Sequence, residues 1–504
     1  MASTASAPPA PSGFSPSSAT LIAQSPKRHF NPWLTLVIVC VAQFMVVLDA
    51  TIVNVALPSI QRGLHFSRPD LQWVINGYTL LFGGFLLLGG RAADLLGRRR
   101  LFIAGVAVFS LASAVNAFAQ SSNVLVAGRA LQGLGAALVS PAALSILTTT
   151  FTDPGERTKA LGVWSGIAAG GAAVGLLMGG VLTDLLSWRW VFIVNLPVGV
   201  GALVAALRYV PESRGAELRR TFDLAGAFAV TSGLVIAVYG IVKAQQYGWG
   251  SGRTLGTLAV AAVLLGAFFF IEKRSPAPLV RLSILRVRTL AAANLSLLFV
   301  MSGMMSMFYF ASLYVQQVLG YSPLRAGFAF LPVTIGIGVG AALAQSLIRR
   351  FDARAVAVAG LSLAAVGMAL LLRTTVHGNY AGQLLLGLVP LALGMGLTFV
   401  PITLLATANV HGDDAGLASG LYNTAQQVGG ALGLAILSTL AASRTSTLLS
   451  GSAGASQHAA LLGGFHLAFG VAAGLLALAA LLLVAMLRRR HVATLDLDAQ
   501  PVLA

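Results

Sequence analysis

LDATIVNVALPSI, from Leu48 to Ile60, places a carboxylate, Asp49, inside an apolar run that begins at Trp33. An ionised side chain at membrane depth costs several kcal/mol, so it is rare and commonly has a specific task. A second charge, Arg129, interrupts the apolar segment VLVAGRALQGLGAALVSPAAL between Val124 and Leu144. Because their charges are opposite, Asp49 and Arg129 are candidate partners within the membrane.

The composition of the chain excludes a soluble globular fold. Of its 504 residues 57% are hydrophobic and 9% are charged, with a mean hydropathy of +0.84. A soluble domain carries about 25% charged residues. The single cysteine, Cys40, rules out an internal disulfide, and we expect it to be a small buried apolar side chain.

Fourteen apolar segments are long enough to cross a bilayer of about 30 Å as helices. They cover 33–54, 72–90, 101–119, 124–147, 160–183, 190–209, 223–243, 254–271, 289–318, 325–347, 354–373, 381–407, 416–440 and 461–487. A transmembrane β-strand would alternate polar and apolar residues over about ten positions, and no segment of this sequence does so. The predicted fold class is therefore an all-α polytopic membrane protein.

Lysine and arginine positions predict the orientation of the spans. With the N-terminus inside the cell, most of the 32 basic residues fall on the cytoplasmic side, as the positive-inside rule requires. Residues 1–32, rich in Ala, Ser and Pro, are expected to form a disordered cytoplasmic tail, and 488–504 a second cytoplasmic tail. We attribute the net charge of +17 to this topology and expect no nucleic-acid partner.

An internal repeat predicts how the spans are assembled. Three glycines of the fifth span recur with the same spacing 258 residues later in the thirteenth: Gly162, Gly171 and Gly175 match Gly420, Gly429 and Gly433. The same shift relates Asp94 to Asp352. These matches favour two parallel six-helix halves, 33–209 and 289–487, joined by a linker with two extra helices, 210–288. Parallel halves with a binding cavity between them describe a large class of secondary transporters.

Four motifs, taken in order, resemble the major facilitator superfamily, specifically its 14-span drug:proton antiporters, the QacA- and EmrB-like multidrug exporters. LDATIVNVALPSI looks like the first-span signature, and GRAADLLGRRR, Gly90 to Arg100, looks like the signature of the loop between spans two and three. RALQGLGAA from Arg129 resembles the fourth-span signature, and SWRWVFIVNLP, Ser187 to Pro197, resembles the entry to the sixth. The resemblance covers the chain from Trp33 to Leu487.

This resemblance implies the major facilitator fold and the export of drugs, antibiotics or other amphipathic small molecules in exchange for protons, by alternating access. Asp49 would carry the exchanged proton and Arg129 would tune it, because burial favours the neutral carboxyl whereas a nearby guanidinium favours the carboxylate. Protons would be the coupling ion, with no other cofactor. The alternative is a static buried ion pair that fixes the register of two helices.

The loop from Gly90 to Arg100 is interpreted as a conformational latch that stabilises one of the alternating states, as the resemblance implies. The latch residues are Gly90, Asp94, Gly97, Arg98 and Arg99, with a weaker copy at Asp352 in the second half. The alternative is a charged tight turn that only obeys the positive-inside rule.

Glycines of the fifth span recur every four residues, so that one helix face can approach a neighbour closely. They are Gly171, Gly175 and Gly179, followed by Gly180, and the thirteenth span repeats them at Gly429 and Gly433. The antiporter signature that this span resembles has a proline where Leu176 stands here. This departure weakens the expected proline kink, and small-residue packing without an antiport role is the alternative.

Polar and aromatic residues on apolar helices are candidates for the substrate cavity, because lipid would leave their polar groups unsatisfied. We predict that nine of them line it: Trp73, Asn76, Tyr78, Asn294, Tyr309, Tyr422, Asn423, Gln426 and Gln427. For any one of these residues, an interhelical hydrogen bond or a position at the membrane interface is the alternative.

Motifs of ATPases and hydrolases are missing from the sequence. No lysine is followed by Ser or Thr as in a Walker A loop, and HExxH and GxSxG are absent. The histidines have no metal-binding spacing. We expect no enzymatic activity and no metal site. The expected partners are a small-molecule substrate and membrane lipids, and the expected state is a monomer, multi-pass in the bacterial inner (plasma) membrane.

Two other functions remain open. One is a narrow-substrate exporter of the same fold for a metabolite, lipid or peptide. The other is a membrane sensor or scaffold without transport activity. A scaffold would not need Asp49 and Arg129, so that a neutral replacement of either residue should leave it functional.

Overall fold

The computed structural model describes residues 31–213, 223–276, 278–407, 410, 414–451 and 456–487. Apart from Asn31 and Pro32, which open the first helix, the two predicted tails lie outside these residues. The helices are α1 (Pro32–Gly63), α2 (Trp73–Leu96), α3 (Arg98–Ala117), α4 (Ser122–Thr150), α5 (Pro154–Leu185), α6 (Trp190–Ile193), α7 (Asn195–Tyr209), α8 (Leu224–Tyr247), α9 (Gly252–Arg274), α10 (Arg288–Leu313), α11 (Pro323–Ala329), α12 (Leu331–Ile348), α13 (Ala353–Leu370), α14 (Leu385–Thr407), α15 (Ala415–Gly451) and α16 (Gln457–Met486).

Fourteen spans in the described residues are long and apolar enough to cross a membrane, which confirms the predicted number and the all-α fold class. Short polar residues cap many of the helices. Asn31, Ser121 and Asp153, for example, each accept a hydrogen bond from a backbone N–H in the first turn that follows. Proline occupies the start of α1, α5 and α11, where its missing N–H would have had no helical partner.

Two of the predicted spans are each built from two helices. α6 ends at Ile193 because Pro197 has no N–H to donate to the Ile193 carbonyl and its ring crowds that carbonyl. Pro332 likewise removes the hydrogen bond to Phe328, and α11 ends at Ala329. The first break lies directly before Asn195, whose side chain is therefore displayed at the start of α7 rather than in mid-helix.

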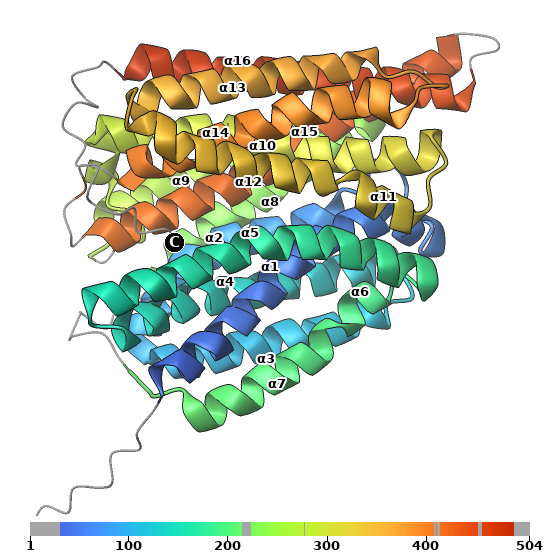
Figure 1. The fold of residues 1–504 in the computed structure, drawn as a ribbon. Coiled ribbons are helices and arrows are strands. Elements are labelled where there is room, and N and C mark those ends of the chain that lie inside the picture. Colours follow the sequence, from blue (N-terminus) through green and yellow to red (C-terminus); the bar gives the residue numbers. More distant parts are fainter. Residues whose placement is uncertain are drawn as a thin grey trace, which may run out of the picture.

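The spans form two bundles that lie one above the other in Figure 1, α1 to α7 below and α10 to α16 above. In the first bundle α5 packs on α1, and α4 packs between α2 and α3. In the second, α15 packs on α10, and α14 packs between α12 and α13. The second bundle thus repeats the packing of the first. The inserted helices α8 and α9 pack on each other, and α8 also contacts α2 and α15.

Both ends of the described chain lie at the same end of the molecule, on the left of Figure 1. We call this end the termini side, and the end that holds α6 and α11 the far side. The bundles are joined by α1 with α10 and α11, by α2 with α15, and by α5 with α11 and α12. The Ser312 hydroxyl donates to the Asn54 carbonyl over 2.9 Å. These two residues are 258 positions apart, so equivalent positions of the repeat meet where α1 contacts α10.

Of the glycines in α5, only Gly180, at the far-side end of the helix, lies against the second bundle. A Cβ at Gly180 would lie 2.8 Å from the Pro323 carbonyl oxygen. Around Gly162, Gly166 and Gly170, towards the termini side, a Cβ would meet no atom within 4 Å. The bundles are therefore joined along α5 at the far side and leave its termini-side glycines uncovered.

Gly179 of α5 offers a test of this packing. A Cβ at Gly179 would lie 2.5 Å from the Ile52 carbonyl oxygen, whereas Gly162 in the same helix has open space around it. We expect Gly179→Ala to lower the free energy of unfolding by about 1–3 kcal/mol through overpacking. Gly162→Ala, the matched control, should be neutral or stabilising because alanine favours the helix. Thermal unfolding of the two purified variants in detergent measures the difference, and equal midpoints would contradict the predicted contact.

Candidate functional site

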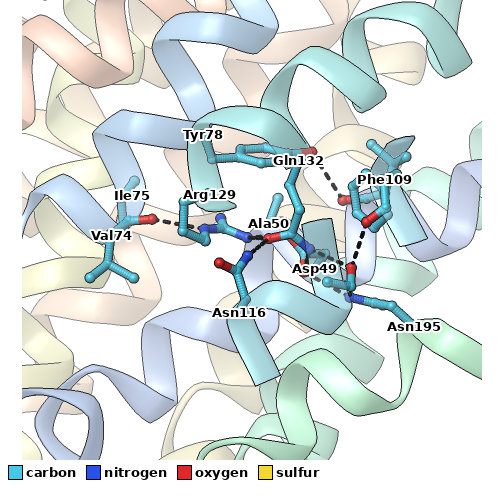
Figure 2. A network of polar contacts seen from close by, with 12 residues as sticks. Asp49, Ala50, Val74, Ile75, Tyr78, Phe109, Asn116, Arg129, Gln132 and Asn195 are labelled. Carbon is cyan, nitrogen blue, oxygen red and sulfur yellow. Dashed lines mark hydrogen bonds and ion pairs between the residues drawn. The ribbon is translucent and has the colours of Figure 1, made fainter. Parts of the chain in front are cut away.

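Asp49 lies in the middle of α1 and is fully buried. Three side chains donate hydrogen bonds to its carboxylate (Figure 2): Arg129 of α4 binds Oδ2, and Gln132 and Asn195 bind Oδ1 over 3.0 and 2.8 Å. The structure therefore brings together the two charges that the sequence paired, and it adds two neutral amides. The carboxylate thus accepts hydrogen bonds from side chains of two other helices.

Arg129 is as tightly enclosed as the carboxylate that it pairs with. Its side chain is 1% exposed, and its Nε donates to the Val74 carbonyl of α2 over 2.9 Å. The guanidinium lies over the ring of Tyr78, 4.5 Å from the ring centre, where the face of the ring attracts a cation. Helices α1, α2 and α4 thus contact each other through one buried charge.

A second layer of polar residues orients the two amides. Gln132 donates to the Ser113 hydroxyl of α3 over 2.7 Å, and its carbonyl oxygen accepts from Asn116 over 2.5 Å. The side-chain carbonyl oxygens of Asn116 and Asn195 are buried and have no hydrogen-bond partner. We call the set Asp49, Tyr78, Ser113, Asn116, Arg129, Gln132 and Asn195 the Asp49 cluster. It lies wholly within the first bundle and draws on α1, α2, α3, α4 and α7.

Sequence reasoning missed Gln132, Asn195, Ser113 and Asn116 as site residues. A signal was present, because each is a polar side chain inside or at the start of an apolar span. What the sequence could not supply was the direction of each side chain. Tyr78, predicted to line the substrate cavity, lies against Arg129.

The glycine face of α5 packs on the turns of α1 that surround Asp49. A Cβ at Gly171 would lie 3.1 Å from Val47, and one at Gly175 would lie 3.1 Å from the Leu48 carbonyl oxygen. Gly429 and Gly433 of α15 pack in the same way on Leu298 and Ser302 of α10. Close helix approach is thus repeated in both bundles.

Leu176, which stands where the resembling signature has proline, is buried between the bundles. It is 1% exposed, and its carbonyl oxygen would lie 2.8 Å from a Cβ at Gly327 of α11. α5 runs without a break from Pro154 to Leu185. The leucine therefore keeps the helix continuous and adds apolar contact at the joint.

The loop between α2 and α3 is fastened to the end of the first bundle. Asp94 accepts two hydrogen bonds from Arg98, over 2.9 and 3.1 Å. Arg99 donates to the Ala206 carbonyl at the end of α7 over 3.2 Å, and its backbone N–H donates to Glu212 over 3.2 Å. Glu212, which sequence reasoning did not select, thus ties the segment after α7 to the start of α3.

The predicted loop from Gly90 to Arg100 is helical except at Gly97, because Gly90 lies within α2 and α3 begins at Arg98. Gly97 has φ of +113°, a region that glycine occupies without strain, and it separates α2 from α3. A Cβ at Gly90 would have Pro141 of α4 as its nearest neighbour, at 3.6 Å. Asp352 lies at the corresponding loop of the second bundle but has another role, since it caps α13 by accepting from the Ala355 N–H over 2.7 Å.

The remaining predicted cavity residues are dispersed. Asn76, Asn294 and Asn423 bond within their own helices, to Gln72, Leu290 and Ser419. Tyr422 accepts a hydrogen bond from Thr403 over 2.8 Å and also bonds Gln426. Gln427 packs on Gly83 of α2. Trp73 packs among apolar residues of α2, α8 and α15. Tyr309 lines a cavity at the far side. Among the described residues no group of three or more His, Cys, Asp or Glu side chains could hold a metal ion.

Neutralising Asp49 should destabilise the first bundle. Asp49→Asn leaves the buried Arg129 without a counter-charge, which costs about 3–5 kcal/mol for pairs of this kind. Replacing both residues, as Asp49→Asn with Arg129→Gln, should recover part of this loss because no uncompensated charge remains. Thermal unfolding of the single and double variants in detergent tests the expectation, and a double variant less stable than the single one would refute it.

Gly97→Ala should be more damaging than the same change at Gly248. Both glycines have positive φ, so alanine strains each backbone by a similar amount, about 1 kcal/mol. A Cβ at Gly97 would also lie 2.7 Å from a carboxylate oxygen of Glu212, whereas none lies within 4 Å of Gly248. The unfolding midpoints of the two variants measure the extra cost, and equal midpoints would mean that Glu212 moves away freely.

Comparison with known proteins agrees with this architecture. A family model described as Major Facilitator Superfamily matches residues 39–434. A puromycin resistance protein of Streptomyces alboniger is 42% identical over 455 residues, covering 89% of this chain and 90% of that protein. A cephamycin export protein of Amycolatopsis lactamdurans is 40% identical, covering 82% and 85%. A multidrug resistance protein of Mycobacterium tuberculosis is 36% identical, covering 82% and 77%.

Solved structures share the fold at low sequence identity. A bacterial homologue of the human lysosomal transporter Spinster, in an inward-facing conformation, matches with a TM-score of 0.64 and 17% identity, over 92% of this chain and 98% of that one. A peptide transporter of the POT family matches with a TM-score of 0.67 and 15% identity, over 92% and 99%. The chain has fourteen spans in two packed bundles, and its relatives are export and resistance transporters, so it is a multi-pass membrane protein and not an enzyme. It belongs to the major facilitator superfamily.

Proposed function

We propose that this protein is a proton-coupled antiporter that exports drugs, antibiotics or other amphipathic small molecules across the bacterial plasma membrane by alternating access. The observation that carries the proposal is a fully buried carboxylate, Asp49, paired with Arg129 inside a membrane-spanning bundle. Protons are the coupling ion and no other cofactor is required. The protein works as a monomer with both termini in the cytoplasm.

Asp49 is suited to exchange a proton because its neighbours can serve either charge state. Ionised, it accepts from Arg129, Gln132 and Asn195. Once protonated it becomes a donor and needs an acceptor. The side-chain carbonyl of Asn195 is buried and without a partner, and rotation of that amide would present it to the new O–H group. Protonation also leaves Arg129 without its counter-charge, which favours a rearrangement of the bundle.

α1 offers a direct route from the proton site to the joint between the bundles. Five residues after Asp49, the carbonyl of Asn54 accepts from Ser312, and that of Val55 accepts from Gln316 over 2.9 Å. A shift of α1 on protonation would therefore strain the far-side contact with α10. The glycines of α5 allow the two helices to slide at close range. With the termini in the cytoplasm, the far-side joint supports assignment of the structure to an inward-facing state.

The loop from Gly90 to Arg100 would act as a latch in this cycle. Its contacts through Arg99 and Glu212 fasten α3 to the segment after α7, so the termini-side end of the first bundle can move as one body. Asp352 caps α13 in the second bundle and would stabilise that end separately.

The relatives favour an antibiotic as substrate. Their names refer to puromycin, cephamycin and tetracenomycin C, and one is a multidrug resistance protein. Narrow-substrate antibiotic export is the second candidate, because three of these names refer to one compound each. Both candidates require the same proton site, and they differ in the range of compounds exported.

Accumulation of ethidium in drug-sensitive bacteria that express the protein tests the proposal. Wild type should lower the accumulated dye, and an uncoupler should restore it because the proton gradient drives export. Asp49→Asn should abolish the effect. Asp70→Asn is the matched control, since that carboxylate pairs with Lys243 outside the cluster, and it should export at least half as well as wild type.

Puromycin and cephamycin resistance should be measured alongside ethidium, so that a narrow-substrate exporter is not overlooked. Membrane levels of each variant are compared by immunoblot, and the Asp49→Asn, Arg129→Gln double variant serves where the single variant does not accumulate. Uncoupler-sensitive export that persists at full rate in Asp49→Asn would remove Asp49 from the proton pathway. Resistance that survives the uncoupler would refute proton coupling altogether.

A further inference from the structure

A cavity of about 310 Å³ lies at the far side of the molecule, separate from the Asp49 cluster. The ends of α10 and α15 and the beginning of α16 form its walls, and the segment that follows α1 covers it. Phe310, Leu461 and Phe465 give it an aromatic and apolar lining. Its volume lies at the lower end of the range for small-molecule sites, about 300–1,000 Å³.

Tyr309 presents an unused hydroxyl at this cavity. It is 2% exposed and lines the cavity, and its hydroxyl has no hydrogen-bond partner in the described part of the chain. The other buried tyrosines there are bonded: Tyr78 to the Val46 carbonyl, Tyr314 to the Thr375 carbonyl, and Tyr422 to Thr403. Tyr309 is the exception among them, so its hydroxyl is available to a ligand group in the cavity that it lines.

Donors prevail among the other polar groups of the cavity. Arg68, at its exposed rim, is its one charged lining residue. Gln317, in the π-helical turn that follows α10, donates to the side-chain oxygen Oε1 of Gln61 in α1 over 2.9 Å, which leaves the amide N–H groups of Gln61 available to a ligand. The Thr445 hydroxyl already donates to its own helix. Acceptor oxygens of a ligand can bind these donors, and negative charge would be favoured beside Arg68.

We propose that this cavity binds an amphipathic molecule with an aromatic body and a carboxylate, the carboxylate paired with Arg68 and a second acceptor oxygen bonded to the Tyr309 hydroxyl. The aromatic body packs against Phe310 and Phe465. Because Gln61 and Gln317 come from different bundles, the ligand binds the arrangement in which the bundles meet at the far side. The role of this site as a station for exported compounds rests on the proposed function, whereas the binding itself does not.

Fluorescein, an aromatic carboxylate, serves as the probe. Its binding to the full-length protein in lipid nanodiscs is followed by fluorescence anisotropy, without a proton gradient. We expect saturable binding to wild type, weakened about tenfold by Tyr309→Phe and by Arg68→Gln, as for the loss of one hydrogen bond to a charged or buried partner. Two matched controls should bind as wild type: Tyr239→Phe, an exposed tyrosine of α8, and Arg62→Gln, a nearby arginine outside the cavity.

Unfolding of the variants without fluorescein separates binding from a structural role. Tyr309→Phe should be as stable as wild type or more so, because the hydroxyl has no protein hydrogen bond to lose. A lower unfolding midpoint would assign the hydroxyl a structural role and overturn the proposal. Three other results would also overturn the proposal. Fluorescein could bind wild type and Tyr309→Phe with equal affinity, or show no saturable binding. The cation rhodamine 6G could displace fluorescein at a lower concentration than analogues of fluorescein do.

Asp49→Asn distinguishes this inference from the proposed function. Fluorescein binding should persist in that variant, because Asp49 does not line the cavity, while export is lost. Binding that persists in a wild type without any export activity would refute the antiporter and leave the site standing. Export by a wild type that does not bind fluorescein would support the antiporter and refute the proposed site.

Discussion

Neutralising charge within apolar helices is the constraint on which the first bundle depends. Arg129 is almost wholly enclosed, and its guanidinium is satisfied by the Asp49 carboxylate, the Val74 carbonyl and the face of Tyr78. The carboxylate comes from α1, whereas the carbonyl and the ring both come from α2. Because a buried charge cannot be left unpaired without a large cost, the positions of α1, α2 and α4 are fixed together. The same interaction that specifies the packing also holds the group best placed to exchange a proton.

Close backbone approach is the second constraint, and it acts in both bundles. Lipid tails are as apolar as leucine, so apolar side chains alone do not drive helices together in a membrane. Glycines at the interface let the backbones approach closely and add van der Waals contact. The glycines of α5 admit the turns of α1 around Asp49, and those of α15 admit α10. Where the superfamily signature has a proline, Leu176 is buried and its backbone carbonyl lies close to Gly327 of α11. Contact at this joint therefore comes from an unbroken helix.

α1 connects the two kinds of site. Its middle carries Asp49, its carbonyls at Asn54 and Val55 bond α10, and its end at Gln61 borders the far-side cavity. A single helix thus touches the buried charge, the joint between the bundles and the cavity. This arrangement gives a physical basis for coupling, since any displacement of α1 alters all three.

The sequence by itself determined the number of spans, the internal repeat and the pairing of Asp49 with Arg129. These depend on composition, periodicity and the cost of a charge in lipid, all of which are local to the chain. Tertiary structure alone decided which polar side chains converge. Asn195 reaches Asp49 because Pro197 breaks the span before it, Glu212 binds Arg99, 113 positions away in the chain, and Tyr78 lies against Arg129. Side-chain direction depends on helix rotation, which is set by contacts between segments far apart in the chain and has no local signature.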